Sequence, residues 1–396
     1  MVSDLVSPDL SRPAEGLSGA SALALQSMRP DLREGFSREV VKFGSMPDEG
    51  LISRRRKYAR RRRVVGLALH SQKVTGFAPS WDRVRGCGAP IGELVAIKEH
   101  EGRVYASGVA QCASVWCCPV CSAKIRTRRE VELERACEIH VASGGSLAML
   151  TLTLRHDRSM SLFQVLGALL RSYRGARHRK AFKAIRRLLA GVVRSLEITY
   201  GENGWHPHLH LLLFVESEVE RESLEALLDD FVTDWRFVVG RDLGVMPSVE
   251  RAVDLTWFGS DTGAAASYVS KIAKEISQAD TKSGRDPFAL LDVEGIERDR
   301  AVAMFMEYGD AMRGVQSISW TKGLRDRLGL GRVISDEEII EDVEVGDEVV
   351  ETIARRDWLA IRREGREVDV FEEIESRLRR QKLFECDEWG EVIDRE

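Results

Sequence analysis

The pattern of apolar and polar positions predicts a group of strands in the middle of the chain. Residues 146–156 and 195–200 alternate in strand fashion, and Gly-Glu-Asn-Gly at 201–204 has the composition of a hairpin turn. This turn leads into residues 204–214, which are apolar on both faces after a histidine-rich start. A strand with two apolar faces is covered on both sides, so we expect it at the centre of a sheet.

Helical spacing of apolar residues predicts the helices around these strands. It occurs in residues 123–140, within 160–190 and within 218–236. A strand ending at 257–258 is followed by residues 260–276, where an alanine run favours a helix that Asp261 or Thr262 can cap.

Composition indicates a globular chain. The 396 residues are 43% hydrophobic and 31% charged, which fits two or three domains. No apolar run approaches the roughly 18 residues of a membrane span, and the first residues lack the basic and apolar regions of a signal peptide. We therefore expect a cytoplasmic protein without membrane contact.

Charge is divided unevenly along the chain. Residues 331–396 hold 11 basic and 22 acidic residues, a net of −11, which leaves +7 for residues 1–330 because the whole chain carries −4. Residues 1 to about 50 are rich in Ser, Pro and Gly without a period, so we expect a poorly ordered arm there. The acidic tail is expected either to compete with DNA for a basic surface or to be an ordinary solvated tail.

A basic run follows this arm. Eight of the eleven residues from 53 to 63 are basic and none is acidic, a density that suits the release of counterions from a phosphate backbone. We therefore predict DNA binding by this run, against the alternative of a solvated charge run. Its basic residues are Arg54, Arg55, Arg56, Lys57, Arg60, Arg61, Arg62 and Arg63.

Five cysteines between 87 and 121 predict a structural metal site. Cys118-Pro-Val-Cys121 is a C-x-x-C knuckle whose short turn can direct two thiolates at one ion. A redox pair has the same spacing, but the further cysteines upstream favour zinc. We expect Cys87, Cys112, Cys118 and Cys121 to bind Zn²⁺, and the replacement of Cys112 by Cys117 stays open.

Three of the eight histidines lie at 206, 208 and 210. Side chains two apart share one face of a strand, so His208 and His210 can bind one ion and leave positions open for water and substrate. If the preceding turn is symmetric, Glu197 lies opposite His208 and supplies a third, oxygen ligand. A slip of one residue would turn Glu197 to the other face. The alternative is a histidine-rich strand end with no ligand.

A tyrosine and a lysine stand three apart on the helix predicted at 260–276. Tyr268 and Lys271 therefore share one face, where an ammonium group can hold a tyrosine oxygen or a phosphate. Most pairs of this kind are surface residues. Because the pair of Tyr268 and Lys271 follows a strand with two histidines that can bind a metal ion, a functional role for this pair is favoured.

In this order the motifs resemble those of rolling-circle replication initiators (Rep proteins) of small, actinobacterial plasmids, within the HUH endonuclease superfamily. The similar segments are the cysteine segment 112–125, the strand 150–154, Gly-Trp-His-Pro-His-Leu-His at 204–210, Tyr-Val-Ser-Lys at 268–271, and 318–325. The resemblance implies an α+β fold of the ferredoxin/RRM-like type, with a central antiparallel sheet flanked by helices and a zinc-binding segment before it.

The resemblance also implies a site and a reaction. His208 and His210, with Glu197 as third ligand, would hold a catalytic Mg²⁺ or Mn²⁺. Tyr268, with Lys271 beside it, would attack a phosphate of single-stranded DNA to give a 5′-phosphotyrosine and a free 3′-hydroxyl.

The chain departs from two versions of the family. Ile272 stands where relatives with two tyrosines have the second one, and Ala264 stands where others have a glutamate. The base that ends the reaction is thus left open, with Glu275 and Asp261 as candidates.

The expected organisation has four parts: a disordered, basic arm (1–80), a zinc-binding segment (81–130), an HUH nuclease domain (131–330) and an acidic tail (331–396). The implied partners are plasmid origin DNA, single-stranded or in a hairpin, and a host helicase and polymerase. Two alternatives are a zinc-containing DNA-binding regulator without nicking activity and an HUH transposase or relaxase.

Overall fold

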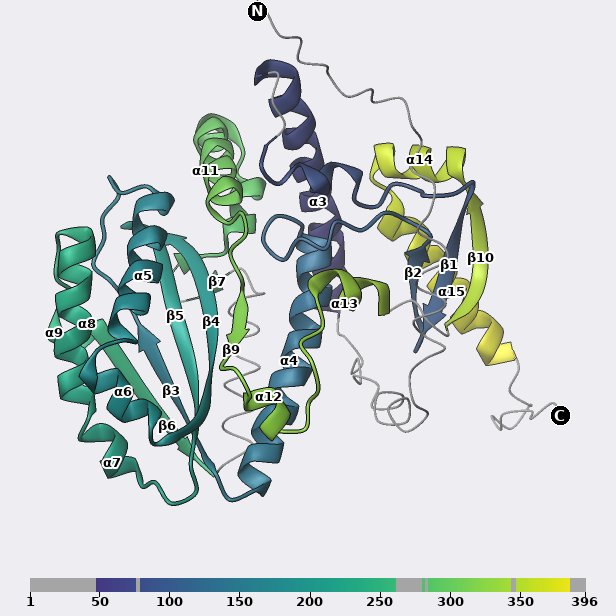
Figure 1. The fold of residues 1–396 in the computed structure, drawn as a ribbon. Helices are drawn as coiled ribbons and strands as arrows, with labels where there is room; N and C mark the ends of the chain where they lie inside the picture. Colours follow the sequence, from purple (N-terminus) through teal and green to yellow (C-terminus); the bar gives the residue numbers. More distant parts are fainter. Residues whose placement is uncertain (1–47, 76–78, 261–279, 282–283, 343–346, 385–396) are drawn as a thin grey trace, which may run out of the picture. The chain divides into compact units, whose positions relative to one another are not determined.

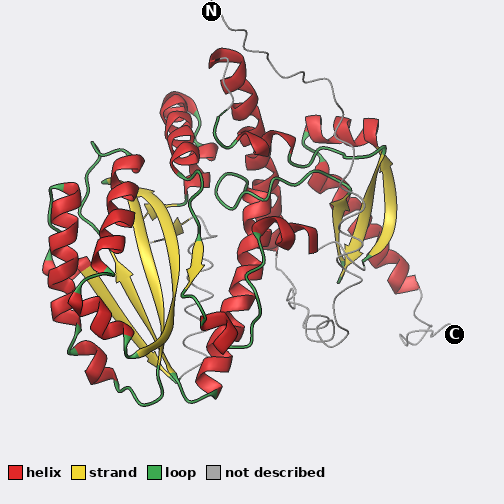
Figure 2. Ribbon diagram, in the orientation of Figure 1, coloured by secondary structure: helices red, strands yellow, loops and turns green. Residues whose placement is uncertain are grey.

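Two antiparallel sheets with helices packed against them form the described part of the chain (Figure 1). The computed structural model describes residues 48–75, 79–260, 280–281, 284–342 and 347–384. Figure 2 separates the seven-stranded sheet from a three-stranded one. The α+β class and the antiparallel sheet flanked by helices are thereby confirmed.

The larger sheet has the spatial order β6-β3-β5-β4-β8-β7, and β9 also pairs with β4. Every pair in it is antiparallel. Its strands are β3 (Ser146–Leu152), β4 (Leu189–Gly201), β5 (Gly204–Val215), β6 (Val253–Gly259), β7 (Asp280–Thr281), β8 (Gly284–Arg285) and β9 (Ile318–Trp320).

The hairpin of β4 and β5 sets the register at the centre of this sheet. Gly201 pairs with Gly204 across a turn formed by residues 202–203, and Glu197 consequently pairs with His208. Gly204 has a φ of 90°, a left-handed conformation that glycine adopts without strain. The two-residue turn therefore fixes which side chains of the two strands share a face.

Helices cover both faces of the sheet because β5 is apolar on both. Leu209 and Leu211 lie on the face that packs with α5 (Leu162–Ala176), while Leu212 and Phe214 lie on the face that packs with α4 (Pro119–Ala142). Figure 1 shows α5 and its neighbours on one side of the sheet and α4 on the other.

The helix α5 begins at a complete capping box. Ser161 accepts a hydrogen bond from the backbone N–H of Gln164, whose side chain accepts one from the backbone N–H of Ser161. The helices beside it are α6 (Lys180–Arg186), α7 (Arg221–Glu225), α8 (Leu228–Leu243) and α9 (Val249–Ala252). The helices expected within 123–140, 160–190 and 218–236 are thus present, whereas the one expected at 260–276 lies, from residue 261 on, outside the described residues.

Six further helical elements lie before the first described strand, between β8 and β9, or after β9. They are η1 (Asp82–Gly86), η2 (Pro287–Asp292), η3 (Gly295–Glu297), α11 (Arg298–Ala311), α12 (Leu324–Arg327) and α13 (Asp336–Asp342). None of the described helices is both long enough and apolar enough to cross a membrane.

The smaller sheet joins the region before the cysteine knuckle to the end of the chain. Its order is β10-β1-β2, from β1 (Leu94–His100), β2 (Arg103–Ser107) and β10 (Glu348–Ala354). Its apolar face packs with Trp358 of α14 (Arg355–Glu364) and Phe371 of α15 (Glu367–Phe384).

The basic run lies on a long helix, α3 (Asp48–Thr75), that pairs with α15. One stripe of α3 meets one stripe of α15 in antiparallel order: Arg54 meets Glu375 at 2.7 Å, Tyr58 meets Phe371 with ring centroids 5.8 Å apart, and Arg61 meets Glu367 at 2.9 Å. The spacing of three or four residues places each set on one side of its helix. Opposite charges and an aromatic contact therefore hold the two ends of the chain together.

The structure differs here from two expectations. Residues 48–75 are a helix rather than part of a poorly ordered arm, and much of 331–396 packs as a strand and helices rather than extending as a tail. The physical reason is that the charges of each segment are offset by the other, about 300 residues away in sequence. The composition of either segment alone therefore does not reveal its partner.

Glu367 is the carboxylate on which this contact most depends, because its side chain is only 1% exposed and receives the buried Arg61. Replacing Glu367 by Ala should lower the free energy of unfolding by about 3 kcal/mol, since an unpaired buried charge remains. Urea denaturation followed by circular dichroism measures the change.

Asp369→Ala is the matched control on the same helix. Asp369 pairs with Arg55, but both side chains are about half exposed, at 45% and 49%. Its removal should cost below about 1 kcal/mol. Equal losses in the two variants would contradict the assignment of the buried pair as the stabilising one.

Candidate functional site

Glu197, His208 and His210 converge on one face of the sheet. Their nearest ligand atoms lie within 4.8 Å of one another, and all three come from the β4–β5 hairpin. Glu197 Oε2 is 3.0 Å from His210 Nε2 and 3.6 Å from His208 Nδ1. Ligand atoms about 2.1 Å from an ion and at right angles are about 3.0 Å apart, so the three residues fit one metal ion.

Hydrogen bonds keep the carboxyl group of Glu197 ionised, the form that binds a cation. Burial opposes the ionisation of Glu197, but hydrogen bonds from His208 and His210 outweigh it and lower the pKa of Glu197 to about 2. Glu197 and His210 are buried and His208 is partly exposed, so an ion here would be open to solvent on the His208 side. Open coordination positions are typical of catalytic metal sites.

A threonine on the neighbouring strand orients one ligand. Thr151 of β3 pairs with His210 of β5, and its Oγ1 lies 3.2 Å from His210 Nδ1. When the proton is on Nδ1, the ring donates to the hydroxyl, and Nε2 is free to bind a metal ion in place of its hydrogen bond to Glu197. Such contacts fix the orientation of a metal-binding histidine.

The third histidine of the motif has a different partner. His206 Nδ1 is 2.8 Å from His156 Nε2, and the carbonyl of Asn203 lies 3.1 Å from His156 Nδ1. Burial, together with the charges of His156 and His208, lowers the pKa of His206 to about 4, so the ring is neutral at pH 7. His206 thus packs beside the metal ligands rather than among them.

Two features near Glu197 were missed by sequence reasoning. Trp116, within the cysteine segment, and Arg126, directly after it, line a small cavity together with Glu197 and Tyr308. Arg126 is buried, its Nε has no hydrogen-bond partner among the described residues, and burial lowers its pKa. The cavity therefore brings the cysteine segment close to the histidine site, and only the tertiary contact reveals it.

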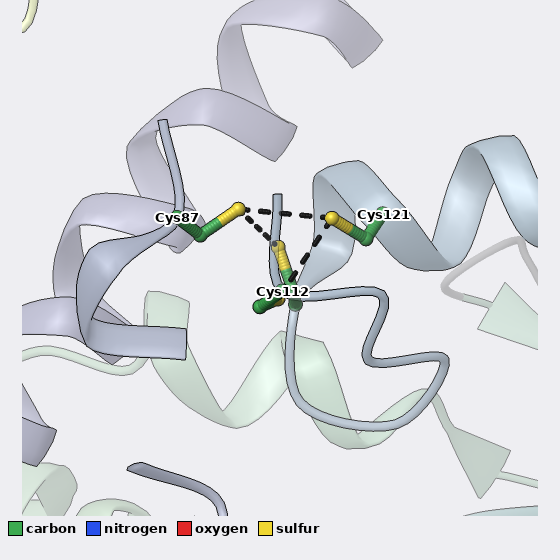
Figure 3. Close-up of side chains that lie close together, drawn as sticks. Cys87, Cys112 and Cys121 are labelled. Carbon is green, nitrogen blue, oxygen red and sulfur yellow. Dashed lines mark hydrogen bonds between the residues drawn. The ribbon is translucent and has the colours of Figure 1, made fainter. Parts of the chain in front are cut away.

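The cysteine cluster forms a second candidate metal site. Figure 3 shows the sulfurs of Cys87, Cys112 and Cys121 pointing toward one another, and Cys118 completes the group. The Sγ–Sγ distances are 3.6 Å for Cys87–Cys118, 3.7 Å for Cys87–Cys121 and 3.8 Å for Cys112–Cys121. Four thiolates about 2.3 Å from a zinc ion lie about 3.8 Å apart at the corners of a tetrahedron, so the cluster fits zinc.

The structure brings together the four cysteines expected from the sequence. Cys117 is buried outside the cluster, where burial raises the pKa of its thiol to about 12. In contrast, hydrogen bonds from the three neighbouring thiols lower the pKa of Cys87. The pKa values of Cys112 and Cys118 are raised as well, so the ligand set follows from geometry: the sulfurs of Cys87, Cys112, Cys118 and Cys121 lie within 4.8 Å of one another.

Two arginines lie against the cluster. Arg362 of α14 donates a hydrogen bond to the carbonyl of Cys87 at 2.7 Å, and Arg61 of α3 packs against Gly88. Gly88 has a φ of 82°, and a Cβ at this position would be 2.8 Å from Arg61 Nη1, so only glycine fits. Four thiolates with one Zn²⁺ would carry a net charge of about −2, and the two guanidinium groups, which also lie near Glu367, would offset part of it.

The basic run is largely engaged within the chain. Six of its eight members form ion pairs with carboxylates, namely Arg54, Arg55, Arg60, Arg61, Arg62 and Arg63. Arg56 and Lys57 pair with no carboxylate of the described residues. DNA binding by this run stays a prediction. Tyr268 and Lys271 lie outside the described residues.

The chain is similar to replication proteins. Residues 106–230 match the Rep_1 family, described as replication protein. A "Protein rep" of Streptomyces lividans is 28% identical over 61% of this chain and 68% of that protein, and a "Protein rep" of Lactiplantibacillus plantarum is 28% identical over 67% and 76%. A "Neomycin resistance protein" of Streptomyces cyanogenus is 27% identical over 37% and 41%.

No solved structure matches the chain. The comparisons confirm the resemblance to Rep proteins that the sequence motifs indicated. The matched range contains Glu197, His208 and His210, and it ends before Tyr268.

Loss of one clustered thiolate should abolish the zinc site. Replacing Cys118 by Ser is expected to lower the zinc content from about one ion per chain to near zero and to lower the melting temperature, because zinc contributes directly to folding. Cys117→Ala is the control, since Cys117 is equally buried but outside the cluster, and it should keep its zinc. Elemental analysis of protein purified without chelators measures the zinc content. Equal zinc loss in Cys118→Ser and Cys117→Ala would contradict the ligand set.

The hydroxyl of Thr151 should support metal binding at the histidine site. Thr151→Val is expected to weaken Mn²⁺ binding by about tenfold, because His210 loses the group that orients it. Isothermal titration with Mn²⁺ measures the affinity. In Thr199→Val, which removes a buried hydroxyl without a partner among the described residues, the affinity should stay within about twofold of the original. Equal weakening by both changes would refute the orienting role.

Proposed function

We propose that this chain, in which residues 106–230 match the replication-protein family, initiates the rolling-circle replication of a plasmid by nicking and rejoining single-stranded DNA at its origin. The observation that carries the proposal is the convergence of Glu197, His208 and His210 inside the matched range. Two imidazoles and a carboxylate at one end of a rigid hairpin are suited to metal-assisted phosphoryl transfer rather than to a closed structural site.

The ligand set fits the divalent cations that assist phosphodiester chemistry. One carboxylate with two imidazoles is a mixed oxygen and nitrogen set, which suits Mn²⁺ and also accepts Mg²⁺. When bound, such an ion polarises the phosphate and offsets the charge that develops on it. Glu197, His208 and His210 would hold the ion, while Thr151 keeps the His210 ring in place.

Tyr268 is the proposed nucleophile, as the resemblance implies. Its phenol oxygen forms a bond to the phosphorus, the bond from phosphorus to the 3′-oxygen breaks, and the proton lost by the phenol is balanced by one gained at the 3′-oxygen. The products are a 5′-phosphotyrosine and a free 3′-hydroxyl, which can prime synthesis. Lys271, one turn after Tyr268, would hold the tyrosine oxygen or the phosphate.

The reaction conserves the energy of the broken bond. A transesterification consumes no nucleotide triphosphate, and the sequence has no G-x-x-x-x-G-K-[ST] loop that would bind one. The energy kept in the phosphotyrosine bond allows the strand to be rejoined when a 3′-hydroxyl attacks in return.

The cysteine cluster has a structural role in this proposal. We assign Zn²⁺ to Cys87, Cys112, Cys118 and Cys121, because their spacing fits a tetrahedron and all four are buried. A site closed by four thiolates has no free position for a substrate. Its function is to fix the segment that carries Trp116 and Arg126 beside Glu197.

Incubation of the protein with Mn²⁺ and single-stranded fragments of the replicon that encodes it tests the function. Covalent adducts support the proposal. Tight binding to origin DNA without adducts would indicate a zinc-containing DNA-binding regulator instead. Adducts formed on transposon ends or a transfer origin, with none on a replication origin, would indicate a transposase or relaxase.

Tyr268→Phe should abolish adduct formation and leave DNA affinity within about twofold, because only the nucleophilic oxygen is removed. Adducts are detected as labelled protein on a denaturing gel, and affinity by fluorescence anisotropy. Tyr200→Phe is the control, since Tyr200 lies on β4 beside the site and its ring packs on Trp205 at a centroid distance of 5.2 Å. Adducts that persist in Tyr268→Phe would assign the nucleophile to another residue.

A further inference from the structure

A second basic run lies in the helical layer of the larger sheet. From Arg171 to Arg187, eight of 17 residues are lysine or arginine and none is acidic. The run covers the end of α5, the link to α6, and α6 itself. It is as free of acidic residues as the run on α3, so sequence composition alone does not distinguish the two.

Packing turns the charged side chains of this run outward. Tyr173, Phe182 and Ile185 are buried, and Phe182 contacts Phe231 of α8 with ring centroids 5.5 Å apart. Because these apolar residues fix the inner side of both helices, the basic residues between them face solvent. The exposed members are Arg171, Arg174, Arg177, Lys180, Lys183, Arg186 and Arg187, which we call the α5–α6 basic surface.

The charges of this surface are not offset by the rest of the chain. None of its seven members forms an ion pair with a described residue. The exception within the run is Arg179, which binds Asp234 and stacks on Phe237 of α8. Asp242 is close enough to Arg171 for an electrostatic interaction, but its carboxylate forms an ion pair with Arg241 at 2.7 Å. On α3, by contrast, six of the eight basic residues are paired with carboxylates.

From this contrast we propose that the α5–α6 basic surface, rather than the paired arginines of α3, is the sequence-independent binding site for the phosphate backbone of duplex DNA. Seven uncompensated charges on a fixed surface release counterions when phosphates bind. The inference rests on the proposed function only in taking DNA as the ligand.

The form of DNA follows from what the surface lacks. Proteins that bind single strands combine positive charge with exposed aromatic rings on which bases stack. Both aromatic residues of this run, Tyr173 and Phe182, are buried, and the exposed ring of Phe237 beside the run is already stacked with Arg179 at 4.8 Å. The run therefore offers charge without a free aromatic ring of its own. The bases of a duplex are already stacked on one another, so a duplex can bind this surface through its phosphates alone.

The location separates this surface from the metal site. Helix α5 packs on the face of β5 that carries Leu209 and Leu211, whereas His208 and His210 point to the opposite face. Duplex DNA on α5 and α6 would therefore be held behind the sheet, and the face with the metal ligands stays accessible to the single strand that is cut (Figure 1).

The test compares two variants of the full-length protein with the same change in charge. In the first, Arg171, Arg174, Lys183 and Arg187 are each replaced by Gln. In the second, four exposed arginines of the C-terminal helices α14 and α15 are replaced by Gln, namely Arg356, Arg363, Arg379 and Arg380. Fluorescence anisotropy with a 30-base-pair duplex of random sequence gives the dissociation constant at a series of KCl concentrations.

The first variant should bind the duplex at least about tenfold more weakly at 0.1 M salt, and its slope of log affinity against log salt should be shallower by about 3. The second variant should keep both values. A third variant with lysine at the three arginine positions, Arg171, Arg174 and Arg187, should recover the original slope, which separates charge from folding.

Three results would overturn the inference: equal weakening by the first two variants, no weakening by either, or weakening only toward a single-stranded 20-mer. Nicking of a short single-stranded substrate is measured in parallel. If the first variant loses duplex binding but still nicks the single-stranded substrate, the result supports the α5–α6 basic surface as the duplex-binding site. Absence of nicking in the unmodified protein would refute the proposed function while leaving the duplex measurement valid.

Discussion

The pairing register of the β4–β5 hairpin is the constraint on which both the core and the candidate site depend. A turn of two residues between Gly201 and Gly204 places Glu197 opposite His208, and His210 follows on the same face. The same register sends Leu209 and Leu211 to α5 and Leu212 to α4. A shift by one residue would bury the histidines under a helix and expose leucines, so the hydrophobic effect itself holds the metal ligands in place.

Charge has two different uses in this chain. On α3 it is structural, because Arg54 and Arg61 lie against Glu375 and Glu367 and are shielded from solvent. On α5 and α6 it is exposed, because apolar neighbours occupy the inner side of each helix. Desolvated charges require partners, whereas solvated ones are available to a ligand. Burial therefore decides whether a basic run binds the protein itself or another molecule.

The cysteine cluster lies where distant parts of the chain meet. Cys87 follows η1, Cys118 and Cys121 lie at the start of α4, and α14 reaches the cluster through Arg362. Trp358 of α14 also donates a hydrogen bond to the carbonyl of Gly88 at 3.0 Å. Metal binding would thus stabilise the contact between the N-terminal helix, the knuckle and the C-terminal helices together, since a ligand that binds only the folded state adds its binding energy to folding.

The sequence by itself determined the features that depend on local periodicity and on short spacings. The apolar residues on both faces of 204–214 predicted the central strand, and a symmetric turn was enough to place Glu197 with His208. The C-x-x-C knuckle identified Cys118 and Cys121, because two ligands three apart need no long-range contact to share an ion.

Only the tertiary structure decided what lies against these segments. It selected Cys112 over Cys117, placed Arg126 near Glu197, and paired the arginines of α3 with carboxylates from the other end of the chain. It also distinguished two basic runs of similar composition, because most members of the α3 run pair with carboxylates and the exposed members of the α5–α6 run do not. Periodicity shows which side of an element is apolar, but the energy of a buried charge depends on a partner that can lie anywhere in the sequence.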